Sequence, residues 1–172
     1  MMEWFQNLLL TLIEADTWVQ YLSVFIMSIV PFFESYVAIP IGIVFGFPAI
    51  QVVVIGALGN WLSVMAFVWL LSGIRKKASK KKQDEKEKEK QGKRWQRAQN
   101  LFKKYGVAGI SFAGPILCFH VCAAVSIASG AKRGYVSLWQ TIGIATWSIA
   151  LGVAFNYGVN LLEYLPNLNP FS

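Results

Sequence analysis

Four long apolar runs dominate the pattern of hydrophobic and polar positions along the chain. They cover residues 18–47, 49–74, 105–131 and 134–160. The apolar residues are continuous rather than arranged in amphipathic stripes, and runs of this length with almost no charge are typical of membrane segments. We therefore expect an all-α integral membrane protein, because a helix satisfies its own backbone hydrogen bonds in lipid.

Two of these runs contain helix breakers. Pro31 and Pro40 interrupt the first run, and Gly114 and Pro115 interrupt the third. Each arm of the third run is about ten to fifteen residues, or roughly 15–23 Å of helix, which is short of a ~30 Å hydrocarbon core. We therefore expect both runs to form re-entrant hairpins, which return to the side of the membrane from which they entered; the alternative is two short, tilted spans in place of each hairpin.

Charge is concentrated between the second and third runs. The net charge is +7, and fourteen of the sixteen lysines and arginines lie between Arg75 and Lys104. Because only four acids share this stretch, it carries +10. The positive-inside rule places it in the cytoplasm, where Lys132 and Arg133 join it if residues 105–131 form a hairpin. One basic loop is not a basic folded face, so we expect no nucleic-acid partner.

This reasoning predicts an inverted repeat of a re-entrant helical hairpin plus a transmembrane helix. A shift of 84 residues aligns Pro31 with Pro115, Gly46 with Gly130 and Gly59 with Gly143. Inverted repeats with broken helices are typical of secondary transporters, whose site lies near the membrane midplane. The expected segments are an interfacial helix in 1–17, a first repeat 18–74 (hairpin 18–47, transmembrane helix 49–74), a basic loop and amphipathic helix 75–104, a second repeat 105–162 (hairpin 105–131, transmembrane helix 134–160) and a tail 163–172.

Glu34 is the strongest candidate for a functional residue. It is the only charged side chain between residues 17 and 74, and an ionised group at the centre of a membrane helix costs about 2.5–3.5 kcal/mol. It is either a proton-coupling carboxylate or cation partner, or a cap for backbone N–H groups where a broken helix restarts. Asn60, near the middle of the second run, contacts substrate or water, or makes an interhelical hydrogen bond.

His120 is the lone histidine and lies between Cys118 and Cys122 in the third run. On a helix the two cysteines share a face and His120 points away. No fourth ligand lies nearby, so we expect no metal. His120 is then a proton relay or a hydrogen-bonded residue of the bundle. Lys132 and Arg133 either contact a phosphate headgroup or anchor the topology.

Enzyme motifs are absent from the sequence. It contains no phosphate-binding glycine-rich loop, zinc-protease helix or nucleophile elbow. We therefore expect no catalytic residue, no enzymatic activity and no cofactor.

The segment PFFESYVAIPIGIVFG, followed by GALGNW, resembles the first half of the small multidrug export proteins. In that family a motif similar to Pro-x-x-Glu-Leu-Arg-Gly-Ala-Ile-Pro precedes a Gly-Asn pair in the next helix. Tyr36 stands where the motif has arginine, and YGVAGISFAGPILCFH is similar in layout to the family's second half, so the resemblance covers roughly residues 18–158. The residues that match the first motif are Pro31, Glu34, Pro40, Gly59 and Asn60.

The resemblance implies a small membrane transporter, and we consider two transport hypotheses and one from a different class. The first is a homodimeric, proton-coupled secondary exporter of amphiphilic small molecules that uses Glu34. The second is a flippase of polyprenyl-phosphate lipid carriers, because the family is similar in architecture to DedA-like membrane proteins. The third is a non-transporting adaptor whose basic loop binds anionic lipid or a partner. All three place the chain among the lipids of the plasma (inner) membrane, with both termini outside and the basic loop cytoplasmic.

Overall fold

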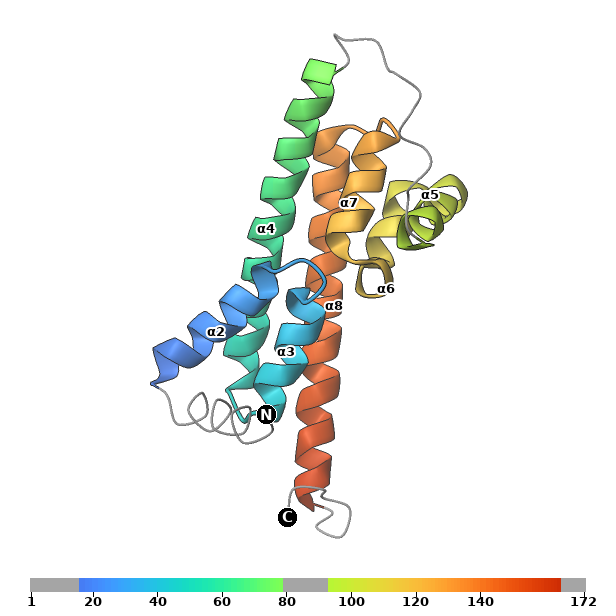
Figure 1. The fold of residues 1–172 in the computed structure, drawn as a ribbon. Coiled ribbons are helices and arrows are strands. Elements are labelled where there is room, and N and C mark those ends of the chain that lie inside the picture. The colour runs from blue at the N-terminus through green and yellow to red at the C-terminus, as the bar shows by residue number, and fades with distance from the viewer. Residues whose placement is uncertain (1–15, 79–92, 165–172) are drawn as a thin grey trace. The chain divides into compact units, whose positions relative to one another are not determined.

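The computed structural model describes residues 16–78 and 93–164 of the chain. Within these ranges every regular element is a helix and there is no strand, which confirms the all-α fold class. The predicted interfacial helix, residues 79–92 of the predicted basic loop and the tail from residue 165 lie outside the described residues. The helices, drawn in Figure 1, are α2 (Thr17–Ile29), α3 (Glu34–Val44), α4 (Ala49–Ala78), α5 (Lys93–Phe112), α6 (Gly114–Leu117), α7 (Phe119–Ala128) and α8 (Arg133–Tyr164).

The chain divides into two compact units. The first holds the residues up to Asn60 and from Thr146 onward, and the second holds Trp61–Ala145. The short helices α2 and α3 belong to the first unit, whereas α5, α6 and α7 belong to the second. The long helices α4 and α8 each contribute one part to each unit.

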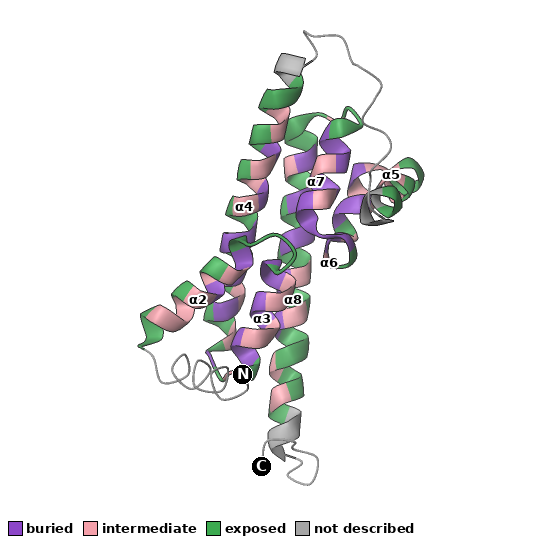
Figure 2. Cartoon of the chain, in the orientation of Figure 1, coloured by how far each residue is buried: buried purple, intermediate pink, exposed green. Residues whose placement is uncertain are grey.

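Two helices, α4 and α8, are long and apolar enough to cross a membrane. Their candidate spans are Ala49–Arg75 and Arg133–Asn160, and the most apolar windows within them have mean hydropathies of 1.9 and 1.4. At ~1.5 Å per residue both spans are about 40 Å long and exceed a ~30 Å hydrocarbon core. Only 33% and 22% of their most apolar windows are buried, and exposed residues recur along both helices in Figure 2. Uncovered apolar surface of this kind fits contact with lipid, whereas a core helix of a water-soluble protein is mostly buried.

The first unit is built around the pair α2 and α3, which pack against each other. With 13 and 11 residues, these helices are roughly 20 and 16 Å long and shorter than a hydrocarbon core. A methyl group on Gly59 would lie 2.8 Å from the carbonyl oxygen of Phe25, so the backbones of α4 and α2 approach closely there. The buried apolar core of this unit is formed by Val24, Ala38, Ile39, Ile43, Phe47 and Val52.

The second unit packs α5, α6 and α7 together. Gly106 has non-helical dihedrals (φ 68°, ψ −162°) and divides α5 into two helical arms at a kink. The arm before it covers the predicted amphipathic segment, and the arm after it belongs to the third apolar run. A methyl group on Gly143 would lie 2.8 Å from the carbonyl oxygen of Ser111, so α8 approaches α5 closely. The buried core cluster of this unit consists of Ile110, Leu117, Cys122 and Val125.

Candidate functional site

Glu34 lies where the chain turns between α2 and α3. α2 ends at Ile29, and Pro31, which has no N–H to donate, lies in the segment before Glu34 begins α3. Phe32 (φ 74°) and Glu34 (φ 51°) both adopt the left-handed conformation that side chains disfavour. The Glu34 side chain is fully buried. Its position in the first turn places the carboxylate at the positive end of the helix dipole, which favours an acid there.

A second polar group lies beside Glu34 in the chain and links α3 to α4. The Asn60 Nδ2 donates a hydrogen bond to the Ser35 Oγ over 3.0 Å, and both side chains are fully buried. The Asn60 Oδ1 has no hydrogen-bond partner in the described part of the chain. Asn60 therefore makes the interhelical bond that was one of its two predicted roles. Its oxygen remains available to a donor such as water or a substrate N–H.

His120 lies in the first turn of α7, within the second unit. Its Nε2 is 2.9 Å from the Ser63 Oγ of α4, and its ring packs edge-on against Phe67 with the ring centroids 5.3 Å apart. The residue before α7 is Cys118, which is buried and has a positive φ of 77°. These contacts fit a histidine hydrogen-bonded within the bundle, and they fix the orientation of its ring.

The predicted hairpin breaks differ in what they do to the helices. Gly114 and Pro115 open the four-residue helix α6, directly after α5 ends. Pro40, in contrast, does not break a helix, because α3 continues through it to Val44. The proline removes one hydrogen bond, the one its N–H would have given to the carbonyl of Tyr36, and the rest of the helix persists.

Lys132 and Arg133 lie where the chain passes from α7 into α8. Both are exposed, and Arg133 begins α8. The Arg133 guanidinium lies over the ring of Trp69 at 4.9 Å from its centroid. Together with Arg75 of α4, the two residues line one pocket of the second unit.

Three residues of the second unit with buried polar atoms carry no prediction from the sequence. The Gln140 side chain is fully buried, and neither its Oε1 nor its Nε2 has a hydrogen-bond partner among the described residues. The Ser111 Oγ and the Trp139 Nε1 are buried without partners in the same part of the chain. Gln140 could have been recognised from the sequence, because it is an amide side chain inside the apolar run 134–160. Such groups are costly in lipid unless water or a substrate meets them.

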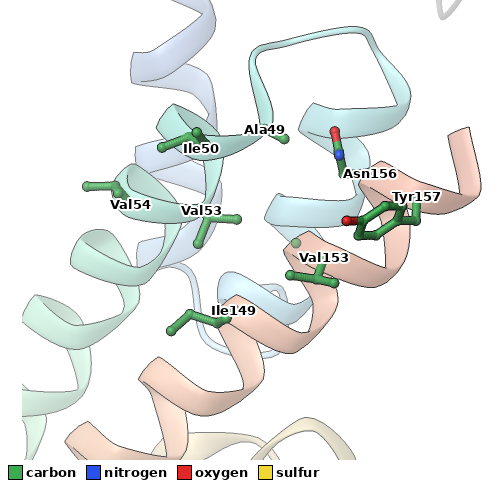
Figure 3. A pocket seen from close by; sticks show the side chains of 9 residues that line it. Ala49, Ile50, Val53, Val54, Ile149, Val153, Asn156 and Tyr157 are labelled. Carbon is green, nitrogen blue, oxygen red and sulfur yellow. The ribbon is translucent and has the colours of Figure 1, made fainter. Parts of the chain in front are cut away.

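An apolar groove of about 340 Å³ lies in the first unit between the start of α4 and the end of α8. Figure 3 shows Ile50, Val53 and Val54 on α4 and Val153 on α8 along its walls. Tyr157 and the amide of Asn156 give it a polar end. A groove with this lining suits a molecule with a large apolar body and one polar group.

A family model described as "Putative small multi-drug export protein" matches residues 34–150, which is more than half of the chain. The match begins at Glu34 and ends within α8. No curated protein and no solved structure matches the chain. The family description and the two candidate spans indicate a membrane location and a transporter rather than an enzyme. The chain belongs to the small multi-drug export protein family.

Proposed function

We propose that the protein is a proton-coupled secondary exporter of amphiphilic small molecules, with Glu34 as the coupling carboxylate. The observation that carries this proposal is a fully buried carboxyl group at a helix break, in a chain of an export family. A carboxyl group can bind and release a proton, and acids within the apolar segments of membrane proteins commonly serve as proton relays. A group that gains and loses a proton as the protein alternates between two states can therefore couple proton movement to export.

We further propose that the fold is an inverted repeat of a re-entrant hairpin and a transmembrane helix. Four pairs of features, each 84 residues apart, support an internal duplication. α4 and α8 begin 84 residues apart, and Gly59 and Gly143 are the points of close approach to a hairpin helix in their own units. The other two pairs both have positive φ angles: Glu34 with Cys118, and Gly46 with Gly130.

The hairpins are proposed to enter from opposite sides of the membrane. The short lengths of α2, α3 and α7 support re-entry, because none reaches across a ~30 Å core. The concentration of basic residues between α4 and the second hairpin supports a cytoplasmic position for that loop. If α4 and α8 each cross once, both termini then lie outside.

The apolar groove supports an amphiphilic substrate. Its walls are apolar along α4 and α8, and its polar end offers the Asn156 amide and the Tyr157 hydroxyl. The groove volume of about 340 Å³ lies at the lower end of the range for small-molecule sites. Small amphiphiles that partition into the membrane could therefore occupy it.

Transport in proteoliposomes tests the function. The probe is ethidium, a lipophilic cation, and an acid-inside proton gradient drives its uptake. We expect the wild-type protein to accumulate ethidium and Glu34→Gln to lose gradient-driven uptake, because the amide cannot exchange a proton. Asp16→Asn is the matched control, since Asp16 is an exposed carboxylate just before α2. If Glu34→Gln takes up ethidium at the wild-type rate, Glu34 is not the coupling group. If the wild-type protein takes up no ethidium, lipophilic cations are excluded as its substrates.

A further inference from the structure

We infer that Arg75, Lys132 and Arg133 form a binding site for the phosphoryl headgroup of an anionic membrane lipid. The three cations line a pocket of about 340 Å³ that lies wholly within the second unit. Its remaining lining residues are small or apolar: Ser72, Ile127, Gly130 and Ala131. The site does not depend on the proposed export function, because it shares no residue with Glu34 or with the apolar groove.

The positive charge of this pocket favours an anionic ligand. Its lining carries three positive charges, and no acidic residue is among the described residues that line it. Like charges this close repel one another unless a counter-charge lies between them. Guanidinium groups match phosphate oxygens with paired hydrogen bonds, and a lysine ammonium adds a compact point charge. A phosphoryl group is therefore the anion that this set of donors fits best.

Two of the three cations are already held in place. The Arg75 Nη1 donates a hydrogen bond to the carbonyl oxygen of Ile127 over 2.9 Å, at the end of α7. Arg133 is held over the ring of Trp69. Side chains that are ordered before binding lose less entropy when a ligand arrives. The hydrogen bond to Ile127 alone would be explained if Arg75 only capped the carboxyl end of α7. A cap does not explain why Lys132 and Arg133 line the same pocket.

Gly130 allows Arg75 to reach this position. Its φ of 98° lies in the region that favours glycine, and a methyl group on it would lie 3.3 Å from the Arg75 Nη2. The Arg75 guanidinium therefore packs closely against the turn that joins α7 to α8, and this turn leaves little space for a side chain at position 130. This residue gives a second, independent way to perturb the pocket.

The position of the pocket favours a lipid over a soluble phosphate. Arg75 is the last residue of the first candidate span, and Arg133 is the first residue of the second. Spans of about 40 Å end at the level of the headgroups, beyond a ~30 Å core. Exposed apolar side chains for acyl chains lie within five residues of these span ends: Leu70 and Ile74 on α4, and Tyr135 and Leu138 on α8.

Native mass spectrometry of the full-length, detergent-purified protein tests the site. Apparent dissociation constants are measured for dioleoyl phosphatidic acid, dioleoyl phosphatidylcholine and inorganic phosphate. We expect phosphatidic acid to bind most tightly. Lys132→Gln and Arg75→Gln should each weaken it about fivefold, since one basic residue near an anionic surface contributes about that factor. Lys103→Gln, an exposed lysine of α5 outside the pocket, is the matched control and should leave binding unchanged.

Lys132 is exposed, so Lys132→Gln should fold normally. The thermal unfolding midpoint of this variant should equal that of the wild-type protein. Gly130→Ala should also weaken phosphatidic acid binding. If Lys132→Gln and Lys103→Gln lose the same affinity for phosphatidic acid, the lipid is attracted by the overall positive charge and the proposed site is wrong. Inorganic phosphate binding as tightly as phosphatidic acid would overturn the lipid as its source. Ethidium uptake, which reports on the export proposal, should be unchanged in Lys132→Gln.

Discussion

Replacing Gly59 or Gly143 by alanine adds one methyl group at the point where a long helix meets a shorter one. In Gly59→Ala this methyl carbon would lie 2.8 Å from the carbonyl oxygen of Phe25 in α2. In Gly143→Ala it would lie 2.8 Å from the carbonyl oxygen of Ser111 in α5. Carbon and oxygen atoms of this kind approach to about 3.3–3.6 Å in close packing. Each substitution must therefore separate two backbones by roughly half an ångström.

Two terms set the size of the effect. Overpacking of a well-packed interface costs about 1–3 kcal/mol. Alanine is also the better helix former and returns up to about 1 kcal/mol relative to glycine. The contact atom is a backbone oxygen, which cannot turn aside as a flexible side chain can. We therefore expect a net destabilisation of roughly 1–2 kcal/mol for each variant.

The assay is thermal unfolding of the purified protein in detergent, with two glycines as matched controls. Gly73 in α4 and Gly158 in α8 are helical residues. Apart from its chain neighbours and the backbone of its own helix, no described residue would lie within 4 Å of a methyl group added to either glycine. Gly73→Ala and Gly158→Ala should keep or raise the midpoint because only the helix-propensity term acts. Midpoints for Gly59→Ala and Gly143→Ala that match the controls would refute the close approach and, with it, one support for the internal duplication.

Three further substitutions test individual features. Gln140→Leu should stabilise the protein by about 1–3 kcal/mol, because it removes a buried amide that has no partner among the described residues. The substitution should also slow ethidium uptake if the amide faces the transport path. A lower stability of the variant would contradict the first expectation. Phe32→Gly should be more stable than Phe33→Gly by about 1–2 kcal/mol, since only Phe32 has a positive φ while both are half exposed; equal midpoints would contradict the strain. Ser63→Ala should cost about 0.6 kcal/mol through its bond to His120, and denaturant unfolding measures the loss.

The two long helices could be predicted from the sequence because length and hydropathy alone define a membrane span. α4 begins at the residue where the second apolar run begins, and α8 begins one residue before the fourth. Both helices continue past the ends of their apolar runs, to Ala78 and Tyr164. In α4 the continuation is Arg75, Lys76, Lys77 and Ala78. Hydropathy does not register it, because a helix can continue on charged residues.

The short helices were harder to predict because a proline or glycine has more than one structural outcome. Pro31 lies in a turn, whereas Pro40 lies inside α3, where the remaining hydrogen bonds of the helix compensate for the one lost. Gly106 kinks α5 at a position that carried no prediction. The sequence specifies the breakers, but tertiary packing decides whether the helix stops, bends or continues.

The partners of the candidate residues could not be predicted from the sequence. Glu34 and Asn60 stood out because polar groups are rare in apolar runs. The bond from Asn60 to Ser35 and the pocket shared by Arg75 and Lys132 join residues far apart in the chain. Such pairs depend on which helix faces meet, and no local pattern encodes that choice.

Cysteine labelling tests the inverted, re-entrant architecture most directly. Single cysteines replace exposed Pro48, Ser129 or Ile116 in a chain whose own Cys118 and Cys122 are changed to alanine. A membrane-impermeant maleimide is then applied to intact cells and to permeabilised cells. We predict that the cysteine at position 48 reacts in intact cells, that the one at 129 reacts only after permeabilisation, and that the one at 116 is never labelled from outside. Reaction at 129 in intact cells would contradict the inversion, and reaction at 116 would contradict re-entry.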